Sequence, residues 1–180
     1  MATTSASSPA ELKSLLDELE LKGLKIAKIE SPSVVYGSIK KERLDNKTKE
    51  YETFYKSAEV DQSIIITFET GRKIGVDFFS ASNVFLTLFK VSYTMKDVDY
   101  KDGDITVSNL FPELIGKTIS DYIILKTDDI NVIRDNGSWE DANFDENQKE
   151  YITKLKFIFT DNTSIGFECD IDFTNFSYER

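Results

Sequence analysis

Histidine is absent from this 180-residue chain, and cysteine occurs once, as Cys169. Without histidine, a Ser-His-Asp triad, a Cys-His pair and a His-ligated zinc site are excluded, and the commonest general base is missing. A single cysteine cannot form an intramolecular disulfide, which fits a reducing compartment. We therefore expect a cytoplasmic protein in which Cys169 is a small core residue.

Long apolar runs and phosphate-binding loops are also missing. No apolar run approaches the roughly 18 residues of a spanning helix, and no basic segment followed by an apolar one opens the chain. Neither G-x-x-x-x-G-K-[ST] nor G-x-G-x-x-G occurs. The acidic stretch 97–108 fails the EF-hand pattern at its glycine and its final glutamate. We expect no membrane segment, no cofactor, no metal site and no enzymatic activity.

Charge is unbalanced toward the acidic side. There are 32 acidic residues against 22 basic ones, giving a net charge of −10. Nucleic acids and anionic membranes would repel such a surface, whereas basic partners or cations would be attracted to it. Some pair of carboxylates must lie close among so many acids, so this feature is weak evidence for a carboxylate-only hydrolase.

One amphipathic helix is predicted near the N-terminus, after a small polar stretch, 1–8, that we expect to be a disordered tail. Ser8 is a suitable cap, and Glu11 completes an S-x-x-E capping box. Gly23 can end the helix. The pattern predicts a helix over 9–22 that packs one leucine face on a sheet, formed by Leu12, Leu15, Leu16 and Leu19.

After Gly23 the hydrophobic period becomes two, and the pattern repeats. L-x-G-x-x-I-x-x-I at 21–29 matches L-x-G-x-x-I-x-x-Y at 114–122, at an offset of 93 residues. An apolar hairpin pattern at 64–75 recurs at 155–166, at an offset of 91 residues. We interpret this as a duplication with one shared core, comprising a first β unit (23–95), a connector (96–113) and a second β unit (114–180).

The repeated hairpins predict their own register. Three-residue loops at 70–72 and 161–163 would pair apolar residues across each hairpin: Phe68–Ile74, Ile66–Val76 and Ile64–Phe78, then Phe159–Ile165, Phe157–Phe167 and Leu155–Cys169. Gly71 aligns with Asn162, and both residue types tolerate positive φ, so a shared turn conformation is expected.

The predicted fold is mainly β, with a minor α component. Further strands are expected at 33–38, 84–95, 104–108, 119–126 and 129–134. Two duplicated antiparallel β-meander units would form one β-sandwich or partly closed barrel with an N-terminal helix.

A row of acids, Glu168, Asp170 and Asp172, alternates along one predicted strand at intervals of about 7 Å. Such a row suits either a cation or an opposing row of basic side chains. The predicted register places Lys156 opposite Glu168 and Lys154 opposite Asp170, which favours structural charge pairs. Asp172 has no assigned partner.

The stretch 134–150 is the least ordinary segment, with six acids, the only tryptophan and no Leu, Ile or Val. Its two aromatic rings either pack on the sheet edge or form an anchor among acids, as at interface hot spots. The corresponding stretch 40–56 has six basic residues against four acidic ones. The candidate partner-binding residues are Trp139, Glu140, Asp141, Phe144, Asp145 and Glu146.

These features together predict a non-catalytic acidic binding protein that inhibits or neutralises a basic macromolecule, such as a nuclease or a nucleic-acid-binding protein. Immunity proteins and phage anti-defence inhibitors act in this way as a class. The alternatives are a small-molecule-binding β-barrel lined by Phe85, Phe89 and Tyr93, and a carboxylate-only hydrolase. A composition rich in Lys, Asn, Ile, Phe and Tyr indicates a bacterial or phage source.

Overall fold

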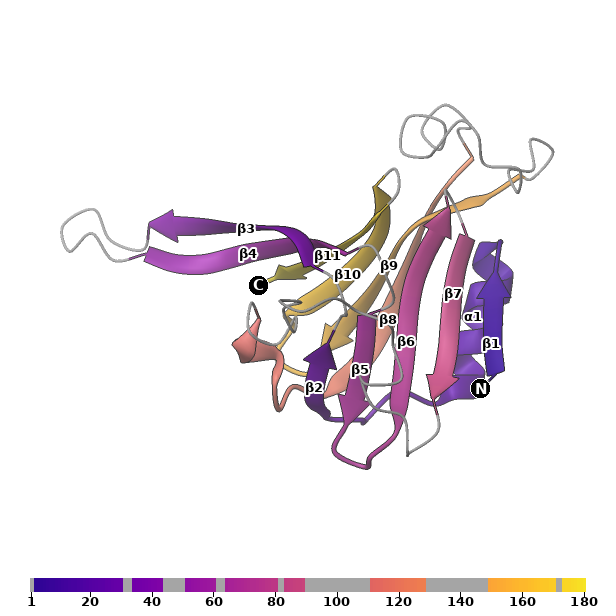
Figure 1. The fold of residues 1–180 in the computed structure, drawn as a ribbon, viewed down its shortest axis with the longest axis horizontal. Coiled ribbons are helices and arrows are strands. Elements are labelled where there is room, and N and C mark those ends of the chain that lie inside the picture. The colour runs from indigo at the N-terminus through magenta and orange to yellow at the C-terminus, as the bar shows by residue number, and fades with distance from the viewer. Residues whose placement is uncertain are drawn as a thin grey trace.

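The computed structural model describes residues 2–30, 34–43, 51–60, 64–80, 83–89, 111–128, 149–170 and 173–180 (Figure 1). This part of the chain is mainly β, with two antiparallel sheets and one N-terminal helix. Within these residues the sheets do not close into a barrel. The strands expected at 104–108 and 129–134 lie outside the described residues.

Helix α1 (Pro9–Leu19) forms where the sequence predicts it. The N–H of Glu11 donates to the Ser8 hydroxyl oxygen at 3.3 Å, while the Glu11 carboxylate accepts from the N–H of Ser7 rather than that of Ser8. The helix stops before the predicted end because Glu20 adopts a left-handed backbone with φ 49°. Of the predicted leucine face, Leu12 and Leu16 are fully buried, and Leu15 and Leu19 pack partly buried against the core.

Each sheet contains a meander extended by strands from elsewhere in the chain. The first sheet has the order β1-β7-β6-β5-β2, with β1 (Ala2–Ala6), β7 (Asn83–Phe89), β6 (Lys73–Ser80), β5 (Ile64–Phe68) and β2 (Ile26–Glu30). The second has the order β3-β4-β11-β10-β9-β8, with β3 (Val34–Arg43), β4 (Tyr51–Val60), β11 (Phe173–Glu179), β10 (Ser164–Asp170), β9 (Tyr151–Phe159) and β8 (Ile119–Thr127). The β3–β4 hairpin extends away from the other strands (Figure 1).

The stretch predicted as a disordered tail contains a strand. Residues Ala2–Ala6 form β1, which pairs antiparallel with β7 and so extends the first sheet by one strand. Small polar residues have no strong local preference for a strand, but an available sheet edge satisfies their backbone groups. Ala6 is fully buried against the core, which ties this strand to the helix that follows.

The two repeated hairpins have the predicted turn conformation but a different register. Gly71 (φ 85°) and Asn162 (φ 65°) both lie in the left-handed region, as expected. Each closes a loop that starts one residue earlier than predicted, because Phe68 and Phe159 donate their N–H to the carbonyls of residues 72 and 163. The partners therefore shift by two positions, giving Ile66–Ile74 and Phe157–Ile165. A shift of two leaves every side chain on its predicted face.

The segments 23–26 and 116–119, which lead into β2 and β8, bind each other reciprocally. Gly23 and Gly116 both have φ 87°, and residues 25 and 118 form an isolated antiparallel bridge. Four backbone hydrogen bonds join the segments in exchanged pairs: Gly23 N–H to Ile119 O and Gly116 N–H to Ile26 O, both at 2.8 Å, then Ile26 N–H to Lys117 O at 2.9 Å and Ile119 N–H to Leu24 O at 3.0 Å. The corresponding positions differ by the same 93 residues found in the sequence.

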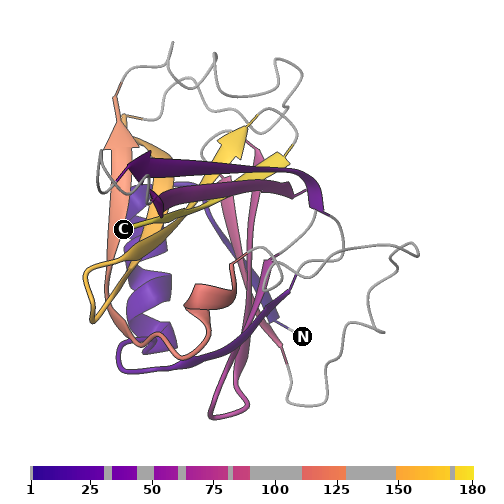
Figure 2. The same cartoon turned by 90° about the vertical axis from the view of Figure 1, so that its left-hand side faces the viewer.

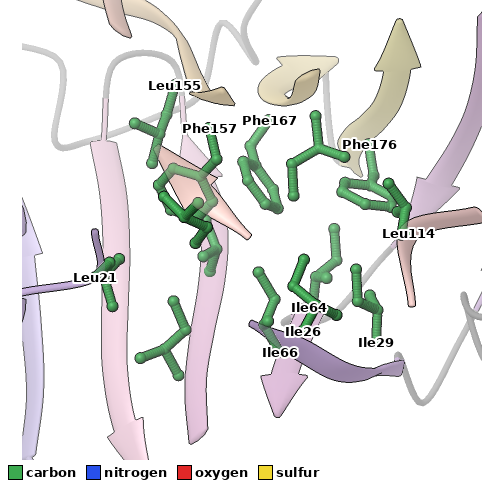
Figure 3. Packing of buried hydrophobic residues seen from close by; sticks show 14 of the residues in the cluster. Leu21, Ile26, Ile29, Ile64, Ile66, Leu114, Leu155, Phe157, Phe167 and Phe176 are labelled. Atoms are coloured by element: carbon green, nitrogen blue, oxygen red, sulfur yellow. The ribbon is translucent and has the colours of Figure 1, made fainter. Parts of the chain in front are cut away.

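The hydrophobic core lies between the sheets, where β6 contacts β10 and β11. Side chains from β2, β5, β9, β10 and β11 point toward one another there (Figure 3). Helix α1 contacts both β1 and β8, which are edge strands of different sheets (Figure 2). The short 3₁₀ helix η2 (Pro112–Leu114) follows Phe111, whose ring meets that of Phe176 edge-on at 5.0 Å.

Candidate functional site

The six predicted partner-binding residues lie outside the residues that the structure describes: Trp139, Glu140, Asp141, Phe144, Asp145 and Glu146. The same holds for the calcium-like stretch 97–108, for Asp172 and for Tyr93 of the proposed barrel lining. These assignments stay predictions. The described surface offers three other features: a charged anchor, a hollow and a pair of exposed aliphatic side chains on β8.

The charge pairing predicted for the acidic row is wrong by one step of the hairpin register. Lys154, expected opposite Asp170, places its Nζ 3.8 Å from a carboxylate oxygen of Glu168. Lys156, expected opposite Glu168, binds Glu179 instead, at 3.1 Å. Both lysine side chains are largely buried. Glu168 therefore has a structural partner on this face.

A charged anchor links the start of β8 to the β9–β10 turn. The Lys117 side chain is only 13% exposed, and its ammonium donates to Asp161 and, at 2.8 Å, to the Thr163 hydroxyl. The same ammonium lies 5.8 Å from the Phe159 ring centroid and 5.6 Å from that of Tyr178. The anchor joins segments 44 residues apart in the chain.

The contacts of Asp161 within this anchor determine its ionisation state. Burial alone would raise the pKa of Asp161, but hydrogen bonds from Lys117 and Thr163 outweigh burial and lower that pKa to about 2. Asp161 is therefore a carboxylate at neutral pH. Sequence reasoning missed the anchor, although one signal existed: Lys117 lies 93 residues after Leu24, the offset of the repeated pattern, so a charged residue stands where the first copy has an apolar one.

A surface hollow of about 410 Å³ lies between the end of α1 and β8. Its lining combines buried leucines with charged groups: Leu16, Asp17, Glu20, Leu21, Lys22 and Tyr122. The Tyr122 hydroxyl donates to the Asp17 carboxylate, which also accepts from Lys13 at 2.6 Å. Lys22 sits 5.2 Å from the Tyr122 ring centroid and 2.9 Å from Asp121.

Three titratable groups at the hollow, Asp17, Asp121 and Tyr122, have pKa values shifted away from neutrality. Hydrogen bonds from Lys13 and then from Tyr122 lower the pKa of Asp17. Burial, followed by the hydrogen bond to Asp17, raises the pKa of Tyr122 to about 12. The hydrogen bond from Lys22 lowers the pKa of Asp121. A general acid or base works best with a pKa near the operating pH, so this arrangement suits binding better than proton transfer.

Strand β8 presents aliphatic side chains to solvent. Ile123 is 45% exposed and Leu125 is 43% exposed, whereas the alternating Tyr122 and Ile124 pack against the core. Among the strands that the structure describes, β8 is also the last of its sheet, and Figure 2 shows it at the sheet border beside α1.

Comparison of the chain with protein-family models, with curated proteins and with solved structures finds no match. Across the described ranges, no helix has the length and apolar character needed to cross a bilayer. The same ranges contain no group of three or more His, Cys, Asp and Glu residues arranged to hold a metal ion.

Proposed function

We propose that this chain is a non-catalytic acidic binding protein that covers a basic surface of another macromolecule and so inhibits or neutralises it. The observation that carries the proposal is the net charge of −10 on a chain without histidine. Such a charge speeds encounter with basic partners and opposes binding to nucleic acid itself. The partner class that best fits is a basic protein, such as a nuclease or a nucleic-acid-binding protein.

Four titratable groups, Asp17, Asp121, Tyr122 and Asp161, are consistent with binding rather than catalysis. Tyr122 stays protonated and Asp17, Asp121 and Asp161 stay ionised across the neutral range, given the directions of their pKa shifts. Their contacts hold the local structure together. None of them is poised to gain or lose a proton near pH 7.

The scaffold is proposed to be a β-sandwich made of two duplicated meanders, 23–95 and 114–180, that share one core and are linked by 96–113. Three features support the duplication. The strand orders β2-β5-β6-β7 and β8-β9-β10-β11 correspond. Bulges fall at matching places, between Ile26 and Lys28 and between Ile119 and Asp121. The exchanged hydrogen bonds between the segments that lead into β2 and β8 have the symmetry expected of two like units.

The partner-binding surface is proposed to be the acidic stretch 134–150 around Trp139, called the acidic loop from here on. A variant with Trp139→Ala, Asp141→Lys and Asp145→Lys changes the net charge from −10 to −6, because two acids become lysines. A matched control, Glu18→Lys with Asp128→Lys, makes the same change in net charge at exposed positions outside the loop.

The test is capture from native lysate by immobilised protein, followed by mass spectrometry. Wild type and the control should retain the same basic protein, and the loop variant should lose it. Retention by the loop variant would contradict the assigned surface, whereas loss from both variants would show that total charge, not the loop, drives binding. Unchanged thermal unfolding of the loop variant would verify that its fold is intact.

A further inference from the structure

The hollow between the end of α1 and β8 has one negative charge that its own ion pairs do not balance. Lys13 pairs with Asp17 at 2.6 Å and Lys22 pairs with Asp121 at 2.9 Å, so these four charges cancel. Glu20 also lines the hollow, and among the described residues no hydrogen bond or ion pair holds its carboxylate. These three carboxylates and two ammoniums leave one negative charge, which a single cation would balance.

The C-terminus of α1 adds to this negative potential. The carbonyl groups that end a helix carry a partial negative charge, equivalent to about half an elementary charge. α1 has no basic residue in its last turn, so nothing within the helix offsets that charge. Glu20 is the residue that caps this end of the helix. An anion would therefore be repelled from the hollow, whereas a cation would be attracted to it.

Tyr122 gives the hollow an aromatic ring that already contacts a cation. The Lys22 ammonium lies 5.2 Å from the ring centroid, which is a cation–π distance. The Lys22 side chain is 57% exposed and its ion pair with Asp121 does not involve the ring, so it can move off the ring at little cost. The Tyr122 hydroxyl donates to Asp17, which holds the ring in place. A ligand cation can therefore take the position on the ring.

A guanidinium group on an aliphatic chain fits these features better than a small inorganic cation or a simple ammonium. A guanidinium is planar and weakly hydrated, stacks on aromatic rings, and binds a carboxylate through two parallel hydrogen bonds. Tyr122 supplies the ring and Glu20 supplies the carboxylate, while Leu16 and Leu21 offer apolar contact to the methylene groups of the chain. The volume of about 410 Å³ lies within the range of small-ligand sites, about 300–1,000 Å³.

We propose that this hollow binds a guanidinium group on an aliphatic chain, and that the group is an arginine side chain of the basic partner. The second statement rests on the proposed function, since a basic protein carries such side chains on its surface. In the complex, the guanidinium lies on the Tyr122 ring and donates to the Glu20 carboxylate. The hollow is then a second contact surface, made of residues outside the acidic loop.

The first experiment titrates the isotope-labelled full chain with N-acetylarginine amide and follows the backbone amides by NMR. The amides of 20–22 and of Tyr122 should shift saturably, with a dissociation constant of about 1–10 mM, the range for a small ligand with one charged contact. N-acetylcitrulline amide has nearly the same shape without the charge, so it should bind at least about fivefold more weakly. N-acetyllysine amide should also bind more weakly, because an ammonium cannot make the forked contact.

One pair of variants tests the role of Glu20. Glu20→Gln should raise the dissociation constant about two- to fivefold, because the free carboxylate is lost. The matched control is Glu18→Gln, which makes the same change in charge at an exposed residue that does not line the hollow, and should bind like wild type. Equal effects of the two variants, equal binding of the arginine compound and either of the other two compounds, or no saturable shift would overturn the assignment of the hollow.

The second experiment tests the source of the guanidinium by capture of the basic protein from lysate. Glu20→Gln should retain less of that protein than Glu18→Gln, although both variants have the same net charge and an unchanged acidic loop. Equal retention would overturn the arginine assignment even when the free compound binds. The titration needs no partner, so failure of the hollow is distinct from failure of the proposed function, which an empty wild-type lane would show.

Discussion

Replacing Lys117 with methionine tests whether the charged anchor stabilises the fold. Methionine keeps the unbranched stem of the 13% exposed side chain but removes the ammonium that contacts Asp161, Thr163 and two aromatic rings. The surrounding packing is retained. The change in the free energy of unfolding therefore reports mainly the ammonium contacts.

The magnitude follows from those contacts. An ion pair to Asp161, whose side chain is 50% exposed, contributes about 0.5–1 kcal/mol after solvent screening. Each cation–π contact contributes about 0.5 kcal/mol at this partly exposed site. Methionine recovers some of the loss because its side chain is buried without desolvating a charge. We expect Lys117→Met to lower the free energy of unfolding by about 1–2 kcal/mol in urea denaturation at pH 7.

The stabilisation should depend on pH in a defined direction. The pKa of Asp161 falls from 3.8 to about 2 in the folded chain, so the folded state favours the carboxylate. Its contribution is fully present above about pH 4 and is lost as the pH falls through about 2. The difference in free energy of unfolding between wild type and Lys117→Met should therefore shrink over that range, and Asp161→Asn should remove most of this pH dependence.

The matched control is Lys126→Met. Lys126 binds Glu150 at 2.6 Å, but both side chains are about half exposed, so its loss should cost no more than about 0.5 kcal/mol. Equal effects of Lys117→Met and Lys126→Met would refute the reasoning, because they would show that the aromatic and hydroxyl contacts of Lys117 contribute nothing. A Lys117→Met effect that is unchanged at pH 2 would refute the role of Asp161.

Two further predictions concern the second hairpin and the shared turn. Lys156→Glu should lower the free energy of unfolding by up to about 1 kcal/mol, and Glu179→Lys should restore it whereas Glu168→Lys should not, in urea denaturation of the single and double variants. Asn162→Gly should change the free energy of unfolding by less than about 0.5 kcal/mol, whereas Gly71→Val should cost about 1–2 kcal/mol because φ is 85° there. Similar thermal melts for those two variants would contradict the shared left-handed turn.

The sequence predicts the helix, the repeated hairpins and the two-sheet class because each depends on local pattern. Ser8 and the leucine spacing specify α1, and the alternation of apolar residues specifies the hairpin faces. The turn residues also predict the register when read correctly. A three-residue hairpin loop needs its left-handed residue at the last position. Gly71 and Asn162 occupy that last position and not the middle position of their loops.

Other features depend on contacts between distant segments, which local pattern does not encode. β1 forms because β7 offers an edge, although Ala2–Ala6 has no strand signature. The anchor of Lys117 arises only when the turn at Asp161 folds against it. The hollow beside Tyr122 is lined partly by Glu20, Leu21 and Lys22, which follow the end of α1 at Leu19 instead of belonging to the helix predicted over 9–22. The acidic loop around Trp139 stays a prediction of the sequence.

The most direct test of the proposed function is to measure capture of a basic protein at low and at moderate salt. Wild type and the Glu18→Lys, Asp128→Lys control should retain one basic protein at low salt and lose much of it at moderate salt, because attraction between opposite charges is screened. The Trp139→Ala, Asp141→Lys, Asp145→Lys variant should retain none. A wild-type chain that captures only acidic proteins, or none, would contradict the proposal that its acidic surface neutralises a basic partner.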